Sequence, residues 1–468
     1  MAHRLGTVIP PPGRAAQPAS CLPYPYSPMP MLEAKSQSGT VLPRIASVDA
    51  LRGLVIMLMI FVNDLGETPQ APILLKHVKI DADAMRLPDL VFPAFLFIAG
   101  MSVPLAMGRV LAAGQTRMQL LRKVLLRVGT LLTMGVIMVN MEEYEPWARA
   151  LWGTLAYVSM FLAFSVVPAE PGRRRTLFLG GKILGAASLV ALALAYRTSE
   201  GKALILGPLW DPSDTIWLRH SWWGILGLIA WAYLVASLVY LVLGRRREWL
   251  VGATGWLVLL YVAARSDLPG QLASRTWLAW ATPAVAALEA GFGWVNGHVG
   301  IGGELGSLAS ISVAGCCLGS ILSEGSDVVE PAHRLRWALS FSLGLFLLGV
   351  VLDAPFGINK IRATPSWCMY CSAITTAAWA FLYWLIDVRG QRRWSRIFQP
   401  AGANPLLAYL LHPFLYLVIG LAGERVAESV FFYHALSPAA TVIGSLVLAF
   451  AVVQATGWIA KAGYRLRA

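Results

Sequence analysis

His77 is the residue of this sequence best suited to chemistry, because it lies in a polar loop between two strongly apolar segments. A neutral imidazole acts as a nucleophile and as a general base near pH 7, whereas lysine is ordinarily protonated and aspartate is only weakly basic. Asp89 opens the second apolar segment, where it could hold the histidine ring in one tautomer. The simpler interpretations are a solvated loop histidine and a carboxylate that stabilises a helix N-terminus.

The first apolar segment carries three polar residues on one predicted helix face. Asp49, Arg52 and Asn63 are offset by three and fourteen residues, which at ~100° per residue puts them within about 60° of one another. At ~1.5 Å per residue this face is about 21 Å long. It predicts either a polar stripe that lines a cavity reaching both membrane surfaces, or an ion pair of Asp49 with Arg52 that orients the helix while Asn63 satisfies a loop carbonyl.

Four polar residues further along the chain are candidates for substrate binding. Asn359 and Lys360 fall in a loop expected outside the membrane, where they would bind sugar hydroxyls or form an exposed turn. Asn404 opens an apolar segment and is most simply a helix cap. His412 lies near the middle of that segment, which predicts either a place on a substrate path or a hydrogen bond between helices.

The elements that must position these residues are membrane helices. The chain of 468 residues is 57% hydrophobic and 13% charged, with a mean hydropathy of +0.62, and is therefore more apolar than a soluble domain. Since a span needs roughly 20 apolar residues, the sequence predicts an all-α, polytopic membrane helical bundle of about 10–12 transmembrane helices. The windows are 47–65, 88–108, 119–141, 148–168, 176–196, 221–243, 249–264, 305–323, 335–352, 367–387, 403–421 and 438–460.

Charged loops give the expected orientation of the bundle. Arginine-rich loops such as 173–175 and 245–247 alternate with acidic or mixed ones, which predicts that both termini are cytoplasmic. The net charge of +13 then reflects topology, with anionic lipid headgroups as partners. Because the arginines are dispersed over separate short loops, we expect no nucleic-acid binding.

The N-terminal residues and the cysteines complete the domain prediction. Residues 1–44 are rich in Pro, Ser and Ala without a long apolar run, which predicts a disordered cytoplasmic segment ahead of one membrane domain over residues 45–468. Cys368 and Cys371 form an isolated C-x-x-C pair without a second ligand pair, so no metal site is predicted.

Several blocks of the sequence resemble one family. SVDALRG, IFVND, a Lys-His loop and PDLVFPAFLFIAG are followed by WGILGLIAWAYLVA, IGGELGSLASI, GINK and GANPLLAYLLHP, in this order between residues 44 and 421. They resemble the transmembrane acyltransferases of the heparan-α-glucosaminide N-acetyltransferase type, including bacterial YeiB-like members. The resemblance implies that acetyl-CoA enters from the cytoplasm and that its acetyl group reaches a glucosamine amine on the opposite face.

The same resemblance assigns roles to residues. His77 matches the histidine of the first outer loop, Asn63 and Asp89 match the polar residues that flank it, and Asp49 and Arg52 match the start of the first block. The histidine would carry the acetyl group as an acyl-imidazole or act as the base on the amine, with Asn63 donating to the oxyanion.

The functional prediction is therefore an acyltransferase of the inner (plasma) membrane. It would use acetyl-CoA as co-substrate, without a metal, and acetylate an amino sugar or glycan on the periplasmic face. Related proteins suggest a homodimer. The alternative is an inner-membrane permease for N-acetylglucosamine or related amino sugars, in which the polar stripe is a translocation path.

Overall fold

The computed structural model describes residues 45–66, 68–141, 146–196, 224–266, 280, 282–323 and 325–467. Within these ranges it consists of helices and loops, and the only β-type pairing is an isolated bridge between Ser165 and Leu466. The predicted all-α class is confirmed. The predicted N-terminal segment 1–44 lies outside the described residues.

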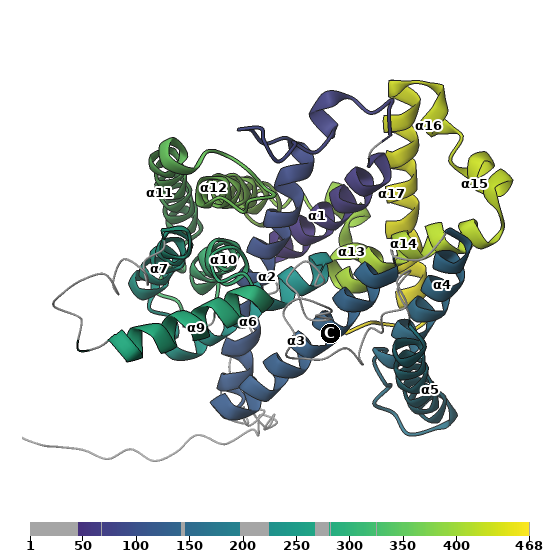
Figure 1. The fold of residues 1–468 in the computed structure, drawn as a ribbon, viewed down its shortest axis with the longest axis horizontal. Coiled ribbons are helices and arrows are strands. Elements are labelled where there is room, and N and C mark those ends of the chain that lie inside the picture. Colours follow the sequence, from purple (N-terminus) through teal and green to yellow (C-terminus); the bar gives the residue numbers. More distant parts are fainter. Residues whose placement is uncertain are drawn as a thin grey trace, which may run out of the picture. The chain divides into compact units, whose positions relative to one another are not determined.

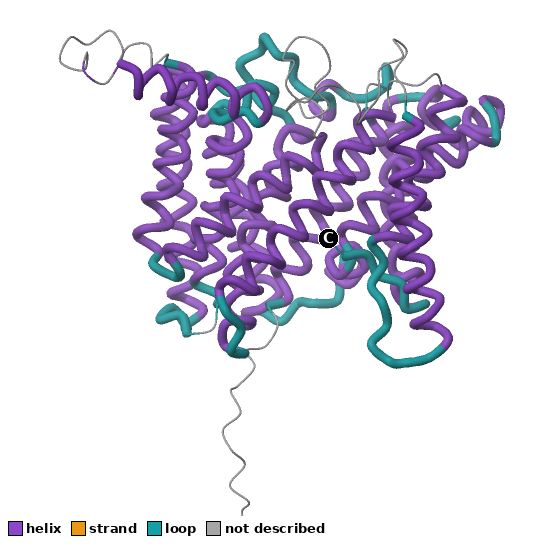
Figure 2. The backbone as a smooth tube through the Cα atoms, turned by 60° about the horizontal axis from the view of Figure 1, so that its bottom comes forward, coloured by secondary structure: helices purple, strands orange, loops and turns teal. Residues whose placement is uncertain are grey.

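Helices of very different length follow one another along the chain. They are α1 (Ala46–Leu65), η1 (Ile73–Leu75), α2 (Leu87–Ala112), α3 (Arg117–Asn140), α4 (Pro146–Ala163), α5 (Arg173–Ala195), α6 (Gly224–Leu243), α7 (Arg247–Arg265), α9 (Thr282–His298), η5 (Gly303–Leu308), α10 (Ala309–Ser320), α11 (Pro331–Phe356), α12 (Pro365–Leu382), η6 (Tyr383–Val388), η7 (Trp394–Ile397), α13 (Gln399–Ala403), α14 (Pro405–Leu421), α15 (Glu424–Val430), α16 (Tyr433–Leu436) and α17 (Pro438–Lys461). In Figure 2 the long helices lie roughly side by side and loops gather at their two ends.

Seven of the described helical spans are long and apolar enough to cross a membrane: α1, α2, α5, α6, α11, α12 with η6, and α17. The segments Ala286–His298 and Gly303–Ser320 form an apolar pair bent by 74°, which makes eight if the pair is one span. The chain is thus built as a multi-pass membrane protein. The number predicted from sequence is higher because it also counted α3, α4, α7 and the short α14, and α3 and α7 carry several charged residues. The larger number stays a prediction.

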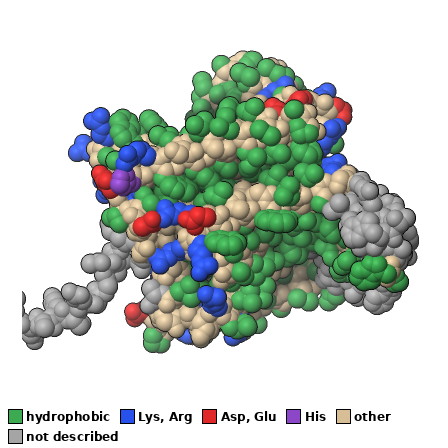
Figure 3. Space-filling model, turned by 90° about the vertical axis from the view of Figure 1, so that its left-hand side faces the viewer, with side chains coloured by type: hydrophobic (Ala, Val, Ile, Leu, Met, Phe, Trp, Pro, Cys, Tyr) green, Lys and Arg blue, Asp and Glu red, His purple; other side chains and the backbone are tan. Residues whose placement is uncertain are grey.

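Contacts between loops define the two ends of the bundle. Hydrogen bonds join the loop between α1 and α2 to the loop between α11 and α12. We call the end of the bundle where these loops lie the His77 end. At the other end, which we call the Arg52 end, the first turns of α1 contact α13 and η6. Since α2 begins at the His77 end, its last turn and the first turn of α3 belong to the Arg52 end. Figure 3 shows a largely hydrophobic surface between charged side chains on two opposite sides of the view.

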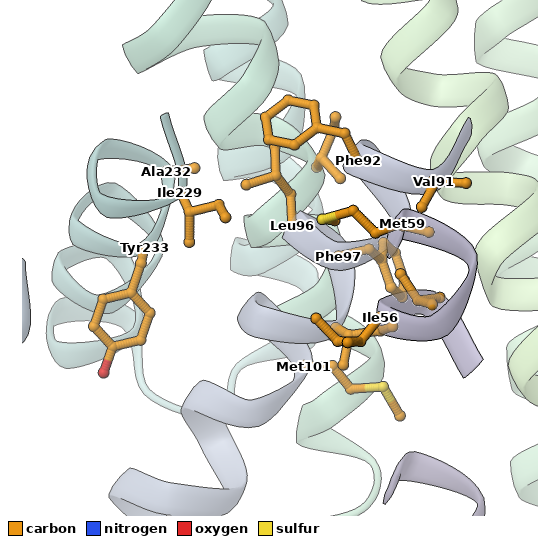
Figure 4. Packing of buried hydrophobic residues seen from close by; sticks show 14 of the residues in the cluster. Ile56, Met59, Val91, Phe92, Leu96, Phe97, Met101, Ile229, Ala232 and Tyr233 are labelled. Carbon is orange, nitrogen blue, oxygen red and sulfur yellow. The ribbon is translucent and has the colours of Figure 1, made fainter. Parts of the chain in front are cut away.

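Close packing against α1 and α10 fixes the position of α2, the helix that carries Asp89. Gly100 of α2 touches α10 so closely that a Cβ would lie 1.8 Å from the Ser312 carbonyl oxygen, and a Cβ on Gly315 would lie 2.0 Å from that of Phe97. Small residues permit this approach of helix backbones. Ile56 and Met59 of α1 lie in the same buried cluster as Leu96, Phe97 and Met101 of α2 (Figure 4).

Candidate functional site

The structure brings His77 and Asp89 into direct contact. His77 Nδ1 lies 2.8 Å from Asp89 Oδ1. The Asp89 side chain is 1% exposed and that of His77 is 46% exposed. Because a carboxylate only accepts hydrogen bonds, the neutral ring carries its proton on Nδ1 and donates it to Asp89. The unprotonated Nε2 is then available as a base or a nucleophile.

Asp89 is held by the start of α2. Its Oδ2 accepts hydrogen bonds from the backbone N–H groups of Arg86, at 3.1 Å, and of Val78, at 3.3 Å. The indole N–H of Trp367 donates to the Asp89 backbone carbonyl at 3.2 Å. One carboxylate oxygen therefore caps the helix while the other contacts the histidine ring. The catalytic role of Asp89 stays a prediction.

Lys360, from the loop between α11 and α12, reaches the same pair. Its Nζ is 3.2 Å from His77 Nδ1 and 4.0 Å from Asp89 Oδ1. Burial lowers the pKa of the Lys360 ammonium, against the opposing effect of the Asp89 charge. Since Nδ1 donates to Asp89, the lysine acts here as a nearby charge, and the sequence did not show that it would join this pair.

Asn359 holds the two loops together instead of forming an exposed turn. It is 5% exposed, and its amide nitrogen donates to the backbone carbonyls of Lys79, Ile80 and Ala82. Its Oδ1 accepts from the Arg362 N–H at 3.0 Å. The polar groups predicted to bind sugar are thus used inside the protein, and Asn359 positions the loop that carries His77.

In the last turn of α1, Asn63 and the next residue, Asp64, lie in different environments. Asn63 is exposed, and its side chain has no polar partner among the described residues. Asp64 is buried and accepts from the hydroxyls of Tyr416 and, at 3.0 Å, Tyr433, while His434 Nε2 lies 3.3 Å from it. Sequence reasoning missed this cluster. Its only sequence signal was a charged residue next to Asn63.

At the other end of α1, the predicted pair of Asp49 and Arg52 is present. The Arg52 guanidinium lies 3.3 Å from Asp49 Oδ1 and also donates to the Gly402 carbonyl at 3.3 Å and to Ser102 Oγ at 2.8 Å. Arg52 therefore links α1, α2 and α13 at the Arg52 end.

The polar face of α1 is interrupted between its two ends. Ile56 and Met59 lie on the same face by helical spacing and are 1% and 3% exposed. Both pack in the apolar cluster with α2 (Figure 4). The continuous polar stripe predicted along this helix is therefore absent, since apolar packing fills its middle.

Helix α14 carries the two remaining candidates. Asn404 stands at its N-cap position, but its Oδ1 accepts from the Leu466 N–H at 3.3 Å and makes no cap bond. Asn404 and His412 are 2% and 6% exposed, and Asn404 Nδ2 and His412 Nε2 have no hydrogen-bond partner within the described part of the chain. One helical turn beyond His412, Tyr416 donates to Asp64. Buried polar atoms thus follow α14 from the Arg52 end toward the His77 end.

The fold and the site define a class: a polytopic helical membrane protein with a partly exposed histidine–carboxylate pair at one end. The described part of the chain contains no cluster of three or more His, Cys, Asp or Glu residues that could hold a metal ion.

Comparison with known proteins adds a partial likeness. Heparan-alpha-glucosaminide N-acetyltransferase from Homo sapiens is 39% identical over 98 residues, and that from Mus musculus is 39% identical over 97 residues. These matches cover 21% of this chain and 14% of each relative. No family model matches the chain. The likeness supports a relationship to membrane acetyltransferases over about a fifth of the sequence.

Proposed function

We propose that this protein is a membrane acyltransferase that moves an acetyl group from acetyl-CoA to the amine of an amino sugar or glycan. The observation that carries the proposal is the His77–Asp89 pair, in which the His77 side chain is partly exposed at one end of the bundle. The likeness to two acetyltransferases supports the same reaction class.

In the first of two routes, His77 carries the acetyl group. Nε2 attacks the thioester carbonyl, a C–N bond forms, the C–S bond breaks and CoA leaves as a thiolate. The Asp89 carboxylate stabilises the positive charge that develops on the ring. Attack by the sugar amine then forms the amide and breaks the bond to Nε2, whose electron pair returns to the ring and leaves His77 neutral. The proton lost by the amine balances the charge of the released CoA thiolate.

In the second route, both substrates are bound together and His77 accepts a proton from the amine as it attacks the thioester. Asp89 again stabilises the imidazolium. The Lys360 ammonium lies 3.2 Å from the ring, close enough to assist an oxyanion or a sugar hydroxyl. Asn63, exposed at the end of α1, is proposed as the oxyanion donor.

The donor is proposed to enter at the Arg52 end, which the arginine distribution assigns to the cytoplasm. Its acetyl group must then reach the His77 end. Buried polar atoms of Asn404 and His412 have no hydrogen-bond partners among the described residues, which favours a passage along α14. The corresponding face of α1 is filled by Ile56 and Met59. The inner membrane, a periplasmic acceptor and a homodimer belong to the same proposal.

The test uses purified protein in detergent with radiolabelled acetyl-CoA and glucosamine or its oligomers. We expect acetylated sugar from wild type and from His333→Ala, a matched control whose side chain is 54% exposed at the start of α11, and none from His77→Ala. Label retained on the wild-type protein without acceptor would favour the first route. Equal product from His77→Ala and wild type would contradict the assigned role of His77.

A permease is the second candidate, and the bent pair Ala286–His298 and Gly303–Ser320 favours it, because broken helices are common in transporters. Vesicles that contain the protein would then accumulate intact amino sugar without acetyl transfer. That result would replace the acyltransferase proposal.

A further inference from the structure

An open cavity of ≈ 580 Å³ lies at the Arg52 end, away from His77. Arg117 of α3, the run Arg245–Arg247 between α6 and α7, and Ser320 and Asp327 around the loop between α10 and α11 contribute to its lining. Three chain segments far apart in sequence therefore converge on one space.

The described lining residues are strongly unbalanced in charge. Four are arginines, and Asp327 is the sole carboxylate among them. Arg247 donates a hydrogen bond to Asp327 and thereby lowers the pKa of the Asp327 carboxyl. The negative charge of Asp327 is therefore already paired with Arg247. Arg117 and Arg246 have no polar partner among the residues that the structure describes. The cavity is therefore positive around these two side chains.

The backbone adds to this positive potential. Arg117 is the first residue of α3, and Arg246 is the N-cap of α7. Each helix N-terminus carries a partial positive charge, which ordinarily favours acidic residues there. Arginines at both positions are unfavourable unless an anion offsets them.

Glycines bring the arginines to the cavity. Gly244 has φ +65° and turns the chain sharply between α6 and the arginine run. Gly325 has φ +72°, and a Cβ there would lie 2.4 Å from Arg245 Nη1. The lack of a side chain at Gly325 thus lets this guanidinium lie against the loop that carries Asp327.

We propose that this cavity binds a phosphate group. The planar guanidinium group matches phosphate oxygens with two parallel hydrogen bonds, and the volume is large enough for a phosphate-bearing headgroup. The phosphate comes either from an anionic phospholipid of the adjoining leaflet or from a soluble phosphorylated molecule. The inference does not depend on acyl transfer.

The test measures the thermal unfolding midpoint of the full chain in phosphatidylcholine nanodiscs. Phosphatidylglycerol in the disc and inorganic pyrophosphate in the buffer are titrated separately. The variant Arg117→Gln/Arg246→Gln removes two cavity charges, and Arg392→Gln/Arg393→Gln removes two charges from exposed arginines in another loop. We expect a saturable rise of the midpoint for wild type and the control, and about 30-fold weaker apparent affinity in the cavity variant.

The two probes identify the source. A response to phosphatidylglycerol alone assigns a lipid headgroup, and a response to pyrophosphate, alone or in competition, assigns a soluble phosphate. No rise with either probe would overturn the proposal, and so would an equal loss of response in both double variants, since bulk charge would then explain the binding. If the double variant does not fold, Arg246→Gln serves in its place, with about 5-fold weakening expected.

Discussion

His77 lies between a buried carboxylate and a lysine, two groups of opposite charge. Asp89 Oδ1 lies 2.8 Å from His77 Nδ1, and Lys360 Nζ lies 3.2 Å from the same atom. The hydrogen bond to Asp89 also selects the tautomer with a free Nε2. In this arrangement Nε2 is the ring atom to which the proposed reaction would transfer a proton or an acyl group.

The first prediction concerns the charge of Asp89. Asp89→Asn keeps the shape of the side chain but removes the negative charge that stabilises a positively charged ring, so kcat for acetyl transfer should fall by about 10²-fold or more. The measurement is the initial rate with saturating acetyl-CoA. Asp81→Asn is the matched control, because Asp81 lies in the loop that carries His77 and its side chain is 88% exposed. Equal rates for both variants would contradict the proposed role.

A second prediction follows from the lowered pKa of Lys360. Between this pKa and the ordinary lysine value, the unfolded chain binds more protons than the folded one, so the free energy of unfolding rises with pH across that window. Lys360→Met lacks this titration. The unfolding midpoint of wild type relative to Lys360→Met should therefore increase as the pH rises from neutral to alkaline.

Lys79→Met provides the control for this measurement, because Lys79 is an exposed lysine in the neighbouring loop between α1 and α2. Its midpoint should stay parallel to that of wild type over the whole pH range. A parallel course for Lys360→Met as well would show that burial does not perturb the lysine.

At the scale of elements, the site depends on how two loops and two helices are joined. Asn359 binds three carbonyls of the loop that follows His77, and Trp367 of α12 binds the first turn of α2. Figure 1 shows the segment between α1 and α2 crossing from the side of α17 to that of α12. The Asp64 cluster anchors the first side of this crossing through α14 and α16.

The third prediction tests the packing that positions α2. In Gly100→Ala the new Cβ would lie 1.8 Å from the Ser312 carbonyl oxygen, so α2 and α10 must separate, at a cost of about 1–3 kcal/mol or more in the free energy of unfolding. Gly108→Ala, on the same helix, meets nothing within 4 Å and should be neutral or stabilising by up to about 1 kcal/mol. Thermal unfolding in detergent measures both, and similar midpoints would refute the close contact.

At the scale of the whole molecule, the two ends of the bundle differ in chemistry. The His77 end carries histidine, carboxylate and lysine in contact, and the Arg52 end carries the arginine-lined cavity. A reaction that takes its donor from one side of a membrane and its acceptor from the other would need such a division.

The fourth prediction concerns orientation. With the Arg52 end in the cytoplasm, a membrane-impermeant maleimide should label Lys79→Cys in intact spheroplasts but label Arg393→Cys only after lysis. Both positions are exposed. The four described cysteines, Cys316, Cys317, Cys368 and Cys371, are buried, and Cys21→Ser in all variants removes the fifth. The unmodified chain is the control. The reverse labelling pattern would invert the proposed topology.

Composition and local spacing determined much of this protein. Apolar segments long enough to span a membrane predicted the all-α bundle, because a buried backbone in lipid must satisfy its hydrogen bonds within helices. His77 and Asp89 could be paired from sequence because only twelve residues separate them, with Asp89 fixed at a helix N-terminus. The Asp49–Arg52 pair follows equally from one helical turn.

Only the tertiary structure decided which distant groups meet. Lys360 joins His77 across 283 residues, and His434 joins Asp64 across 370, so no local periodicity relates them. Helical spacing placed Asn63 on a polar face of α1, but packing against α2 buries the middle of that face. The buried polar residue at the end of α1 is Asp64 and not Asn63. The arginine-lined cavity likewise exists only where three loops converge. Side-chain contacts of this kind depend on how helices pack, which the order of residues along each helix does not specify.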